Sequence, residues 1–352
     1  MTLWGAEMTR YCRANYRIIN PQAKMDPKNP RPFDALTPDF ILQAVEGHGL
    51  ICDGRIFPLN SYENRVYQVG IEDSEPLIAK FYRPERWTEE QVREEHEFCF
   101  ELVDQELPVV APITGADDDS VLRRGAYLYA LFPRRGGRAP ELDNLDNLLV
   151  LGRLLGRIHR IGASKPFEHR PLLDSASYGY ASVKFIVDGV IPVELESAYQ
   201  EVASELLSRI DAALREASPI RNIRVHGDCH IGNMLWRDDA PHFVDFDDTR
   251  MAPAVQDLWM LLSGDRREQT IQLDQVLTGY CEFADFNYRE LRLVEALRSL
   301  RMLYYSAWLA RRWDDPAFPL SFPWFNTHNY WEGHVADLRA QVQEVDEQPL
   351  LL

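Results

Sequence analysis

Residues 225–248 read VHGDCHIGNMLWRDDAPHFVDFDD, and this segment carries the densest set of polar and acidic side chains in the chain. Within it, short apolar runs separate Asp228, Asn233 and Asp245, and such runs predict short strands joined by loops. An aspartate can orient a hydroxyl group or accept its proton, and carboxylate and amide oxygens are the ligands that Mg²⁺ prefers. The three residues therefore favour metal-dependent phosphoryl transfer.

The end of this segment, HFVDFD at 242–247, alternates apolar and acidic residues. Alternation of this kind predicts a strand, and on a strand Phe243, Asp245 and Asp247 would share one face. Whether Asp247 adds charge at a metal site or caps a turn stays open from the sequence.

Two other interpretations of the segment are weaker. His226 and His230 have a spacing that could serve zinc, but neither an HExxH nor a CxxC motif accompanies them. A polar turn between buried strands could also contain aspartate and asparagine as caps. The concentration of acidic residues in so short a segment argues against that simpler interpretation.

A lysine far upstream adds a second element. Residues 76–82 read PLIAKFY and predict a strand, on which Ile78, Lys80 and Tyr82 share one face. A lysine between apolar neighbours suits a nucleotide cleft, where it would meet the phosphates. On an edge strand the same lysine would instead lay its stem over apolar surface, and the strand pattern alone leaves both interpretations open.

The segment TEEQVREEHEFCFELV that follows predicts a helix, with Thr88 and Gln91 as a capping box. At about 100° per residue, Glu95 falls on the apolar face, whereas Glu94 falls on the opposite face and is expected to be solvated. A buried carboxylate needs a partner, because an unpaired one costs several kcal/mol. Lys80 is the expected partner of Glu95.

A second buried carboxylate is expected on the segment AVQDLWMLL at 254–262, which is apolar nearly all round and predicts a buried helix. Asp257 on that helix must accept hydrogen bonds from a polar group. The backbone of the loop at 226–230 is a suitable donor.

The chain changes character at PRRGGRAP, residues 133–140, where prolines and glycines mark a linker. Upstream, a short helix at 37–47, strands at 64–70 and 76–82 and a strand pair at 121–132 predict a β-rich part over 35–132. Downstream, over 141–352, helical periodicity predominates. Residues 1–34 are rich in proline without a clear period, which predicts a poorly ordered arm.

The composition narrows the class of protein. The 352 residues are 45% hydrophobic and 26% charged, which is typical of globular proteins. The net charge of −17 argues against nucleic-acid binding, because phosphate backbones would be repelled. Five cysteines without a CxxC pair favour a reducing compartment, and neither a secretory signal nor a membrane-spanning run is visible. We therefore expect a cytoplasmic protein without a membrane anchor.

A lysine on a β-rich part, a glutamate on the next helix, a linker, HGDCHIGN and FVDFDD together resemble the protein-kinase-like fold. The HGD at 226–228 is similar to the aminoglycoside and choline phosphotransferase branch of that fold, whereas eukaryotic protein kinases have HRD. Longer strings, including AKFYRPERWT and PAVQDLWMLLSGD, resemble bacterial Ser/Thr protein kinases of that branch which act in the stress response. The likeness starts near Leu36. It implies an α+β, two-lobed fold, with a small β-rich N-lobe at 35–132 and a larger, mostly helical C-lobe at 141–352.

The resemblance also assigns catalytic and metal-binding roles. It implies that Asp228 is the catalytic base, that Asn233 and Asp245 bind Mg²⁺, and that Asp245 is itself essential for catalysis. Asp257 matches the acidic residue that braces the catalytic loop. The metal motif is DFD and lacks the glycine of DFG, which argues against a DFG-style flip of an activation loop.

On the nucleotide side, the resemblance implies that Ser61 contacts ATP and that Lys80, with Glu95 as its helix partner, binds the phosphates. This chain departs from ordinary protein kinases because it has no GxGxxG loop. Its first hairpin turn carries Ser61 to Asn64 instead, so backbone N–H groups and the Ser61 hydroxyl would meet the phosphates.

The resemblance implies ATP- and Mg²⁺-dependent phosphorylation of serine or threonine hydroxyls on proteins, including the enzyme itself, by a cytoplasmic monomer. The alternative is a kinase for a small alcohol such as an aminoglycoside, choline or homoserine, because both reactions place one hydroxyl in line with the γ-phosphate. The aromatic segment at 313–331 would favour a protein acceptor if it lined an open cleft, and a small alcohol if it formed a lid. A nucleotide-binding module without turnover is disfavoured by the intact set of chemical residues.

The acceptor side carries arginines whose roles stay open. Arg134, Arg135 and Arg138 flank the linker, and Arg301, Arg311 and Arg312 lie on a late predicted helix. They could recognise an acidic or phosphorylated partner, or they could be solvated charges on helices and loops.

Overall fold

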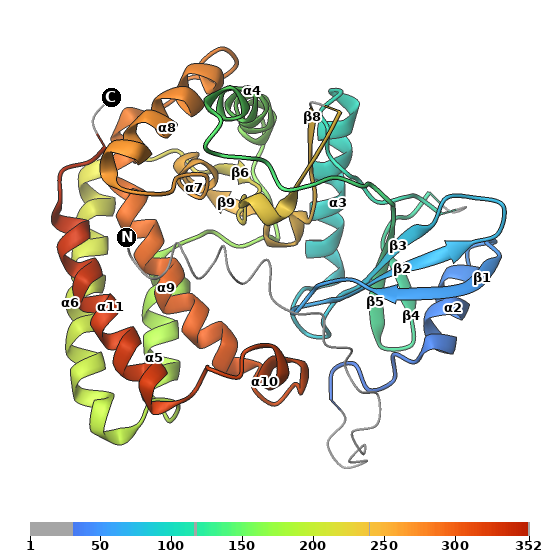
Figure 1. Ribbon diagram of the computed structural model, residues 1–352, viewed down its shortest axis with the longest axis horizontal. Helices are drawn as coiled ribbons and strands as arrows, with labels where there is room; N and C mark the ends of the chain where they lie inside the picture. The colour runs from blue at the N-terminus through green and yellow to red at the C-terminus, as the bar shows by residue number, and fades with distance from the viewer. Residues whose placement is uncertain (1–30, 116–117, 239, 351–352) are drawn as a thin grey trace.

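The computed structural model describes residues 31–115, 118–238 and 240–350. Two lobes lie side by side, and the α3 helix lies between them (Figure 1). The smaller lobe contains a five-stranded antiparallel sheet, and the larger lobe is mostly helical with two small two-stranded sheets. The predicted α+β, two-lobed, protein-kinase-like architecture is confirmed.

The N-lobe is built on a sheet of strand order β1-β2-β3-β5-β4. Both helices of this lobe begin as the sequence predicts: the Thr37 side chain caps α2, and Thr88 with Gln91 forms the capping box of α3. Its elements are α2 (Pro38–Glu46), β1 (Cys52–Pro58), β2 (Arg65–Ile71), β3 (Leu77–Phe81), α3 (Glu89–Asp104), β4 (Leu122–Arg124) and β5 (Tyr127–Pro133).

One strand of this sheet is missing from the sequence prediction. The β1 strand, CDGRIFP, contains Gly54 and ends at Pro58, and both residue types are unfavourable in strands. Among the described strands it pairs only with β2, and its side chains lie partly or fully exposed. An edge strand of this kind lacks the buried alternation by which strands are recognised.

The predicted N-terminal arm lies mostly outside the described residues, and only residues 31–34 of it can be placed. Phe33 stacks on Tyr127 with ring centroids 6.0 Å apart, and the guanidinium of Arg65 lies 4.3 Å from the centre of the Phe33 ring. These last residues of the predicted arm therefore pack on the N-lobe.

The C-lobe follows a segment without regular structure between Pro133 and Leu145. Its elements are α4 (Leu145–Gly162), α5 (Ala181–Val187), α6 (Val193–Ala217), β6 (Ile223–Val225), β7 (Met234–Arg237), β8 (Ala240–Phe243), β9 (Arg250–Ala252), α7 (Val255–Trp259), α8 (Arg266–Tyr280), α9 (Val294–Arg311), α10 (Ala317–Ser321) and α11 (His328–Asp346). The described elements are compatible with domain boundaries at 132 and 141, which stay a prediction.

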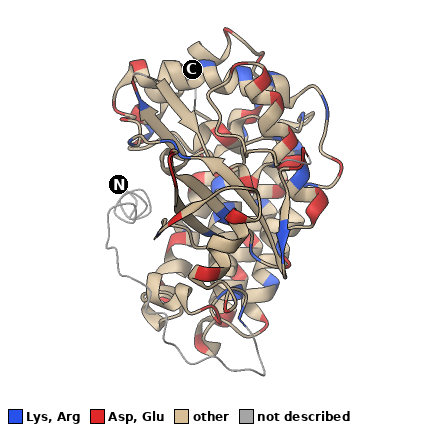
Figure 2. Ribbon diagram, turned by 90° about the vertical axis from the view of Figure 1, so that its right-hand side faces the viewer, with Lys and Arg blue, Asp and Glu red and all other residues tan. Residues whose placement is uncertain are grey.

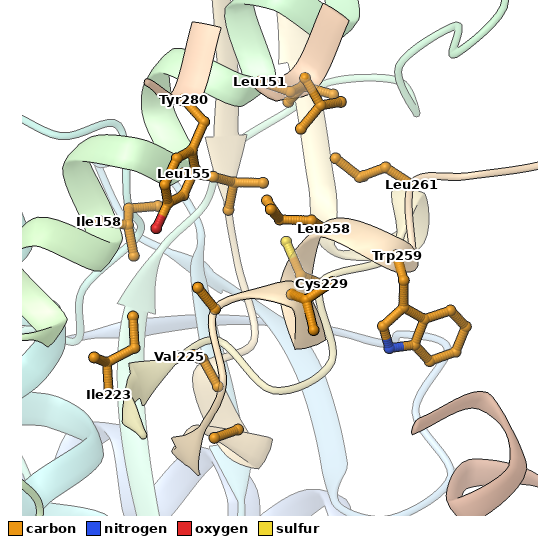
Figure 3. Close-up of a cluster of buried hydrophobic side chains, with 14 of the residues drawn as sticks. Leu151, Leu155, Ile158, Ile223, Val225, Cys229, Leu258, Trp259, Leu261 and Tyr280 are labelled. Carbon is orange, nitrogen blue, oxygen red and sulfur yellow. The ribbon is translucent and has the colours of Figure 1, made fainter. Parts of the chain in front are cut away.

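A large hydrophobic core lies directly beneath the chemical segment. Leu151 and Leu155 of α4 are fully buried, as the periodicity of that helix predicts, and they pack with Leu258 of α7. The thiol of Cys229 points from the loop after β6 into this cluster (Figure 3). The loop that carries the chemistry is therefore anchored to the main core of the lobe.

The α3 helix is fixed to the C-lobe by the loop at 168–170. The Glu94 carboxylate accepts hydrogen bonds from the backbone N–H groups of Glu168, His169 and Arg170, at 2.5, 3.0 and 2.8 Å. The Arg170 guanidinium in turn donates to the carbonyl of Gln91 at 2.7 Å. The expectation that Glu94 is solvated was therefore wrong, because the side of α3 that carries Glu94 faces the loop at 168–170 of the C-lobe.

Charged residues of both signs are spread over the elements of the two lobes (Figure 2). None of the described helices combines the length and the apolar composition needed to span a bilayer. The four described cysteines, Cys52, Cys99, Cys229 and Cys281, are all free thiols.

Candidate active site

Asn233 comes just before β7 and Asp245 comes just after β8, so both lie at the open end of the β7–β8 hairpin. Met234 of β7 pairs with Phe243 of β8, and the backbone N–H of Val244 donates to the carbonyl of Asn233 at 3.0 Å. The hairpin thus brings together two residues that the sequence predicts as metal ligands. Their proximity follows from antiparallel pairing alone.

The predicted common face for Phe243, Asp245 and Asp247 was wrong. The β8 strand ends at Phe243, and Asp245 has the left-handed conformation φ 62°, ψ 61°, followed by a 3₁₀ turn over Phe246–Asp248. Aspartate tolerates this conformation better than most residues, and it reverses the direction of the chain. As a result the side chains of Phe243 and Asp247 are buried, whereas the carboxylate of Asp245 is 51% exposed.

Lys80 is buried at the centre of a group of carboxylates. Its ammonium lies 2.9 Å from Asp245, 3.3 Å from Asp247 and 3.4 Å from Glu95. Burial alone would lower the pKa of Lys80, but the three carboxylates raise it well above its ordinary value. The β3 strand lies between β2 and β5, so the edge-strand interpretation of Lys80 was wrong.

Glu95 points inward, as the helical periodicity predicts, and is almost fully buried. Its closest charged partner is Arg170 at 2.8 Å, whereas Lys80 lies at 3.4 Å. Burial raises the pKa of Glu95, and the neighbouring Lys80 and Arg170 oppose that shift. The sequence prediction found Lys80 but missed Arg170, because that arginine lies on a loop of the other lobe.

Asp247 is a buried partner of two cations. It forms an ion pair with Arg86, and Lys80 lies 3.3 Å away. Burial would raise the pKa of Asp247, but Arg86 and Lys80 lower it below the ordinary range. The positive charges of Arg86 and Lys80 therefore keep this carboxylate ionised.

Asp228 lies on the loop after β6, where Gly227 has φ 84° and no room for a Cβ atom against the carbonyl of Asp248. The Oδ1 atom of Asp228 lies 2.8 Å from Arg301 of α9, and Oδ2 lies 3.3 Å from His230. Burial would raise the pKa of Asp228, but Arg301 and His230 hold it well below its usual range. The carboxylate is therefore ionised at neutral pH.

Asp257 braces this loop, as the sequence predicts. Its side chain is fully buried and accepts hydrogen bonds from the backbone N–H groups of His226 at 2.7 Å and Gly227 at 2.9 Å. The Nε2 atom of His159 lies 3.0 Å from the same carboxylate. Three partners thus satisfy a charge that would otherwise be costly in the core.

Ser61 lies in the turn at 59–64 between β1 and β2, where its hydroxyl donates to the carbonyl of Asn64 at 3.2 Å. The neighbouring Glu63 reaches across to the C-lobe, where its carboxylate accepts from the indole of Trp308 and lies 2.6 Å from Arg312. The turn that holds Ser61 is therefore tied to the end of α9.

A second carboxylate, on the C-lobe, adds to the contact between the two lobes. Asp315, just after α9, lies 2.9 Å from Arg65 and 2.6 Å from Arg83 of the N-lobe. All of these side chains are largely buried. We call this set the inter-lobe latch, and it consists of Glu63, Arg65, Arg83, Trp308, Arg312 and Asp315.

The aromatic segment at 313–331 also makes a contact between the two lobes. Phe322, just after α10, packs on Tyr62 of the turn with ring centroids 4.8 Å apart. Trp331 is fully buried in the core of the C-lobe, and Trp313 and Trp324 pack against that core. The segment therefore packs inside the C-lobe, and its part next to α10 also touches the N-lobe turn at 59–64 (Figure 1).

The donors offered by Asn233 and Asp245 fit Mg²⁺. The amide nitrogen of Asn233 donates to the carbonyl of Asp228 at 3.0 Å, which leaves its amide oxygen as an acceptor, and Asp245 adds a half-exposed carboxylate. In the described part of the chain, no three His, Cys, Asp or Glu side chains could hold a metal by themselves. Mg²⁺ is commonly bound by one or two protein groups together with substrate phosphates, so two oxygen donors are sufficient.

Comparison with known protein families and sequences places the chain among phosphotransferases. The model of the phosphotransferase enzyme family matches residues 56–294. The chain is 46% identical to stress response kinase A of Escherichia coli over 321 residues, which cover 91% of this chain and 97% of that protein. It is 44% identical, over the same shares of both chains, to the serine/threonine protein kinase RdoA of Salmonella typhimurium.

Solved structures give the same fold. An amicoumacin kinase in complex with AMP-PNP and Ca²⁺ has a TM-score of 0.69 at 17% identity, and it covers 89% of this chain and 94% of its own. A microcompartment-associated aminopropanol kinase has a TM-score of 0.65 at 16% identity, with 89% and 99% covered. A spectinomycin phosphotransferase in complex with ADP has a TM-score of 0.64 at 15% identity, with 87% and 98% covered.

Proposed function

The chain belongs to the phosphotransferase enzyme family, and we propose that it transfers the γ-phosphoryl group of ATP to an alcohol hydroxyl with the help of Mg²⁺. The observation that carries this proposal is the contact of Lys80 with Asp245 at 2.9 Å. It joins the central strand of the N-lobe sheet to the hairpin that carries the proposed metal ligands. A phosphate-binding lysine and an oxygen-rich metal site are what the reaction requires at one place.

Each proposed residue has a separate task in this reaction. Asn233 and Asp245 would hold Mg²⁺, which neutralises phosphate charge and so assists transfer when it is bound. Lys80 would bind the phosphates, with Glu95 holding its ammonium in place. Ser61 and the backbone of its turn would cover the phosphates from the N-lobe side. Asp228 would orient the acceptor hydroxyl.

Asp228 suits orientation better than early proton removal. Arg301 and His230 keep its pKa well below the usual range, so its carboxylate is a weak base. Such a carboxylate can still accept a hydrogen bond and align the hydroxyl oxygen with the phosphorus. In a loose transition state the hydroxyl proton leaves late, so alignment is the larger part of the task.

For the acceptor, we propose serine and threonine hydroxyls of proteins, with the enzyme itself among them. Support comes from the relatives that are 44–46% identical over 91% of the chain and are named stress response kinase A or serine/threonine protein kinase. We extend the proposal to a role in the stress response and to action as a cytoplasmic monomer, in keeping with the free thiols.

A second acceptor class is favoured by the inter-lobe latch. The contacts of Glu63 with Arg312 and of Asp315 with Arg83 join the two lobes beside the proposed nucleotide turn. Such a bridge narrows the space open to a folded protein, and a small alcohol would fit a narrower site more readily. A small-alcohol kinase is therefore the alternative function.

Calorimetric titration with AMP-PNP, with and without EDTA, tests the nucleotide and metal proposal. The acidic residues around the site should prevent binding without Mg²⁺, so equal affinity in both titrations would contradict it. Asn233→Ala and Asp245→Ala should abolish Mg²⁺-dependent binding. Asp228→Asn should leave binding nearly intact while kcat falls by orders of magnitude.

Radiolabelled Mg·ATP, incubated with dephosphorylated casein or with aminopropanol, tests the acceptor. Phosphoserine or phosphothreonine on casein, or on the enzyme, supports the protein-kinase function. Rapid turnover of aminopropanol without any phosphoprotein would support the alternative. Turnover of neither acceptor, together with nucleotide binding, would point to a binding module without catalysis.

A further inference from the structure

The two carboxylate oxygens of Asp228 lie in different surroundings. The Oδ1 atom is completely buried and lies 2.8 Å from Nη1 of Arg301. The side chain as a whole is nevertheless 22% exposed, so the exposed surface belongs to its other atoms, among which Oδ2 is the only oxygen. An acceptor hydroxyl can approach only Oδ2, which has its nearest protein contacts at 3.3 Å from His230 and 3.4 Å from Asn233.

The geometry points to Arg301 as a positioning residue, which holds Oδ1 of Asp228 so that Oδ2 faces the acceptor hydroxyl. The inference rests on the proposed function, because it needs Asp228 to orient that hydroxyl. It adds two assignments to that proposal. Arg301 of α9 contacts the catalytic loop at Oδ1 of Asp228, and Oδ2 is the oxygen that accepts the hydrogen bond of the acceptor hydroxyl. Arg301 itself touches neither nucleotide nor acceptor in this assignment.

The helix that carries Arg301 is well fixed. On α9, the neighbouring Leu300 and Met302 are buried, and Tyr304, one turn further on, stacks on Tyr178 with ring centroids 4.2 Å apart. A guanidinium carried by such a helix restricts the positions that a loop carboxylate can take. Held in this way, Asp228 has little freedom to rotate about its side-chain bonds.

Nearby arginines do not duplicate this contact. Arg250 and Arg86 both pair with Asp248, at 2.7 and 2.9 Å. Among the described arginines and lysines, only Arg301 lies within ion-pair distance of Asp228. Removing its guanidinium should therefore free the carboxylate to rotate.

The test compares three arginine variants in the full chain. Arg301→Met removes the guanidinium but keeps an unbranched stem, and we expect kcat with Mg·ATP to fall about 100-fold. Arg301→Lys restores a cation with poorer geometry, and it should recover part of that loss. Arg339→Met, at an exposed position of α11, is the matched control and should keep the wild-type kcat.

The acceptor in this assay is casein, or aminopropanol where casein is inert, and the dissociation constant for Mg·AMP-PNP is measured in parallel. Loss of kcat with nucleotide affinity and acceptor KM within about threefold of wild type supports the inference. An unchanged kcat in Arg301→Met would overturn it, and so would a raised acceptor KM at normal kcat, because Arg301 would then bind the acceptor. Weakened nucleotide binding in Arg301→Met would also overturn it, since the site as a whole would then be disturbed. A wild-type enzyme that turns over neither acceptor would overturn the proposed function as well.

Discussion

The ammonium of Lys80 lies 2.9 Å from Oδ1 of Asp245, although the two residues are 165 positions apart in the chain. One belongs to the central strand of the N-lobe sheet and the other to the turn after β8. Lys80 is also shared with Asp247 and Glu95, so three carboxylates surround one buried cation. This arrangement sets the charge that an incoming triphosphate would meet.

Lys80→Met should weaken binding of Mg·AMP-PNP by about 10- to 100-fold, because the substitution removes the proposed phosphate ligand. It should also lower the free energy of unfolding by about 3–5 kcal/mol, since buried carboxylates lose their cation. Calorimetry and urea unfolding measure the two effects. Lys184→Met is the control, since the side chain of Lys184 is 75% exposed. Unchanged affinity in Lys80→Met would exclude a phosphate-binding role.

Asp257→Asn should destabilise the protein by about 3 kcal/mol, because an amide can accept from only one of the two backbone N–H groups while presenting a donor to the other. The loop that carries Asp228 should become less well positioned, so kcat should fall as well. Urea unfolding and a steady-state assay give both values. Asp274→Asn lies on the exposed face of α8 and should be neutral. If the two variants behave alike, Asp257 does not brace the loop.

Asp315→Ala should lower the free energy of unfolding by about 3–5 kcal/mol, because it leaves Arg65 and Arg83 without their common carboxylate. The adjacent Asp314 is exposed, so Asp314→Ala is a control at the next position of the chain. Thermal unfolding followed by calorimetry should show the difference directly. Equal stability of the two variants would mean that the inter-lobe latch adds nothing to the stability of the fold.

The stability of the protein should fall as the pH falls from about 6.5 to about 4, in part because of His334. Burial lowers the pKa of His334 from 6.5 to about 4. Above pH 6.5 the imidazole is neutral in both the folded and the unfolded state. Between these two values only the unfolded state binds the proton, so each pH unit lost should cost about 1.4 kcal/mol for this residue.

His334→Gln should reduce this slope, because glutamine does not titrate. Some slope should remain, since burial also lowers the pKa of His96, to about 3. Urea unfolding at pH 7.5 and 5 for both proteins measures the change. A slope that is the same in wild type and variant would show that His334 is not buried as a neutral group.

Local features of this fold were readable from the sequence because they depend on neighbours in the chain. The caps at Thr37 and Thr88 need only the three or four residues that follow them. The inward position of Glu95 and the bracing role of Asp257 followed from one argument, that a carboxylate on an apolar helix face must find a donor.

The features that were missed depend on tertiary contacts. The partners of Glu63 and Arg65 in the latch are about 250 residues away, and an isolated charge carries no sign of which distant charge it meets. Arg301 was singled out as a charge of open role, but its contact with Asp228 depends on how α9 packs. The left-handed turn at Asp245 was hidden by an alternating pattern that continues past the end of the strand.

The attachment of α3 to the loop at 168–170 has a consequence for inhibitor design. One way for a ligand to enlarge the site would be to displace α3 outward, away from this loop. Here such a displacement would break the buried pair of Glu95 with Arg170 and the three backbone hydrogen bonds to Glu94. The binding free energy of such a compound would be reduced by the several kcal/mol needed to break these contacts. Ligands that leave α3 in place are therefore the more practical chemical probes for this chain.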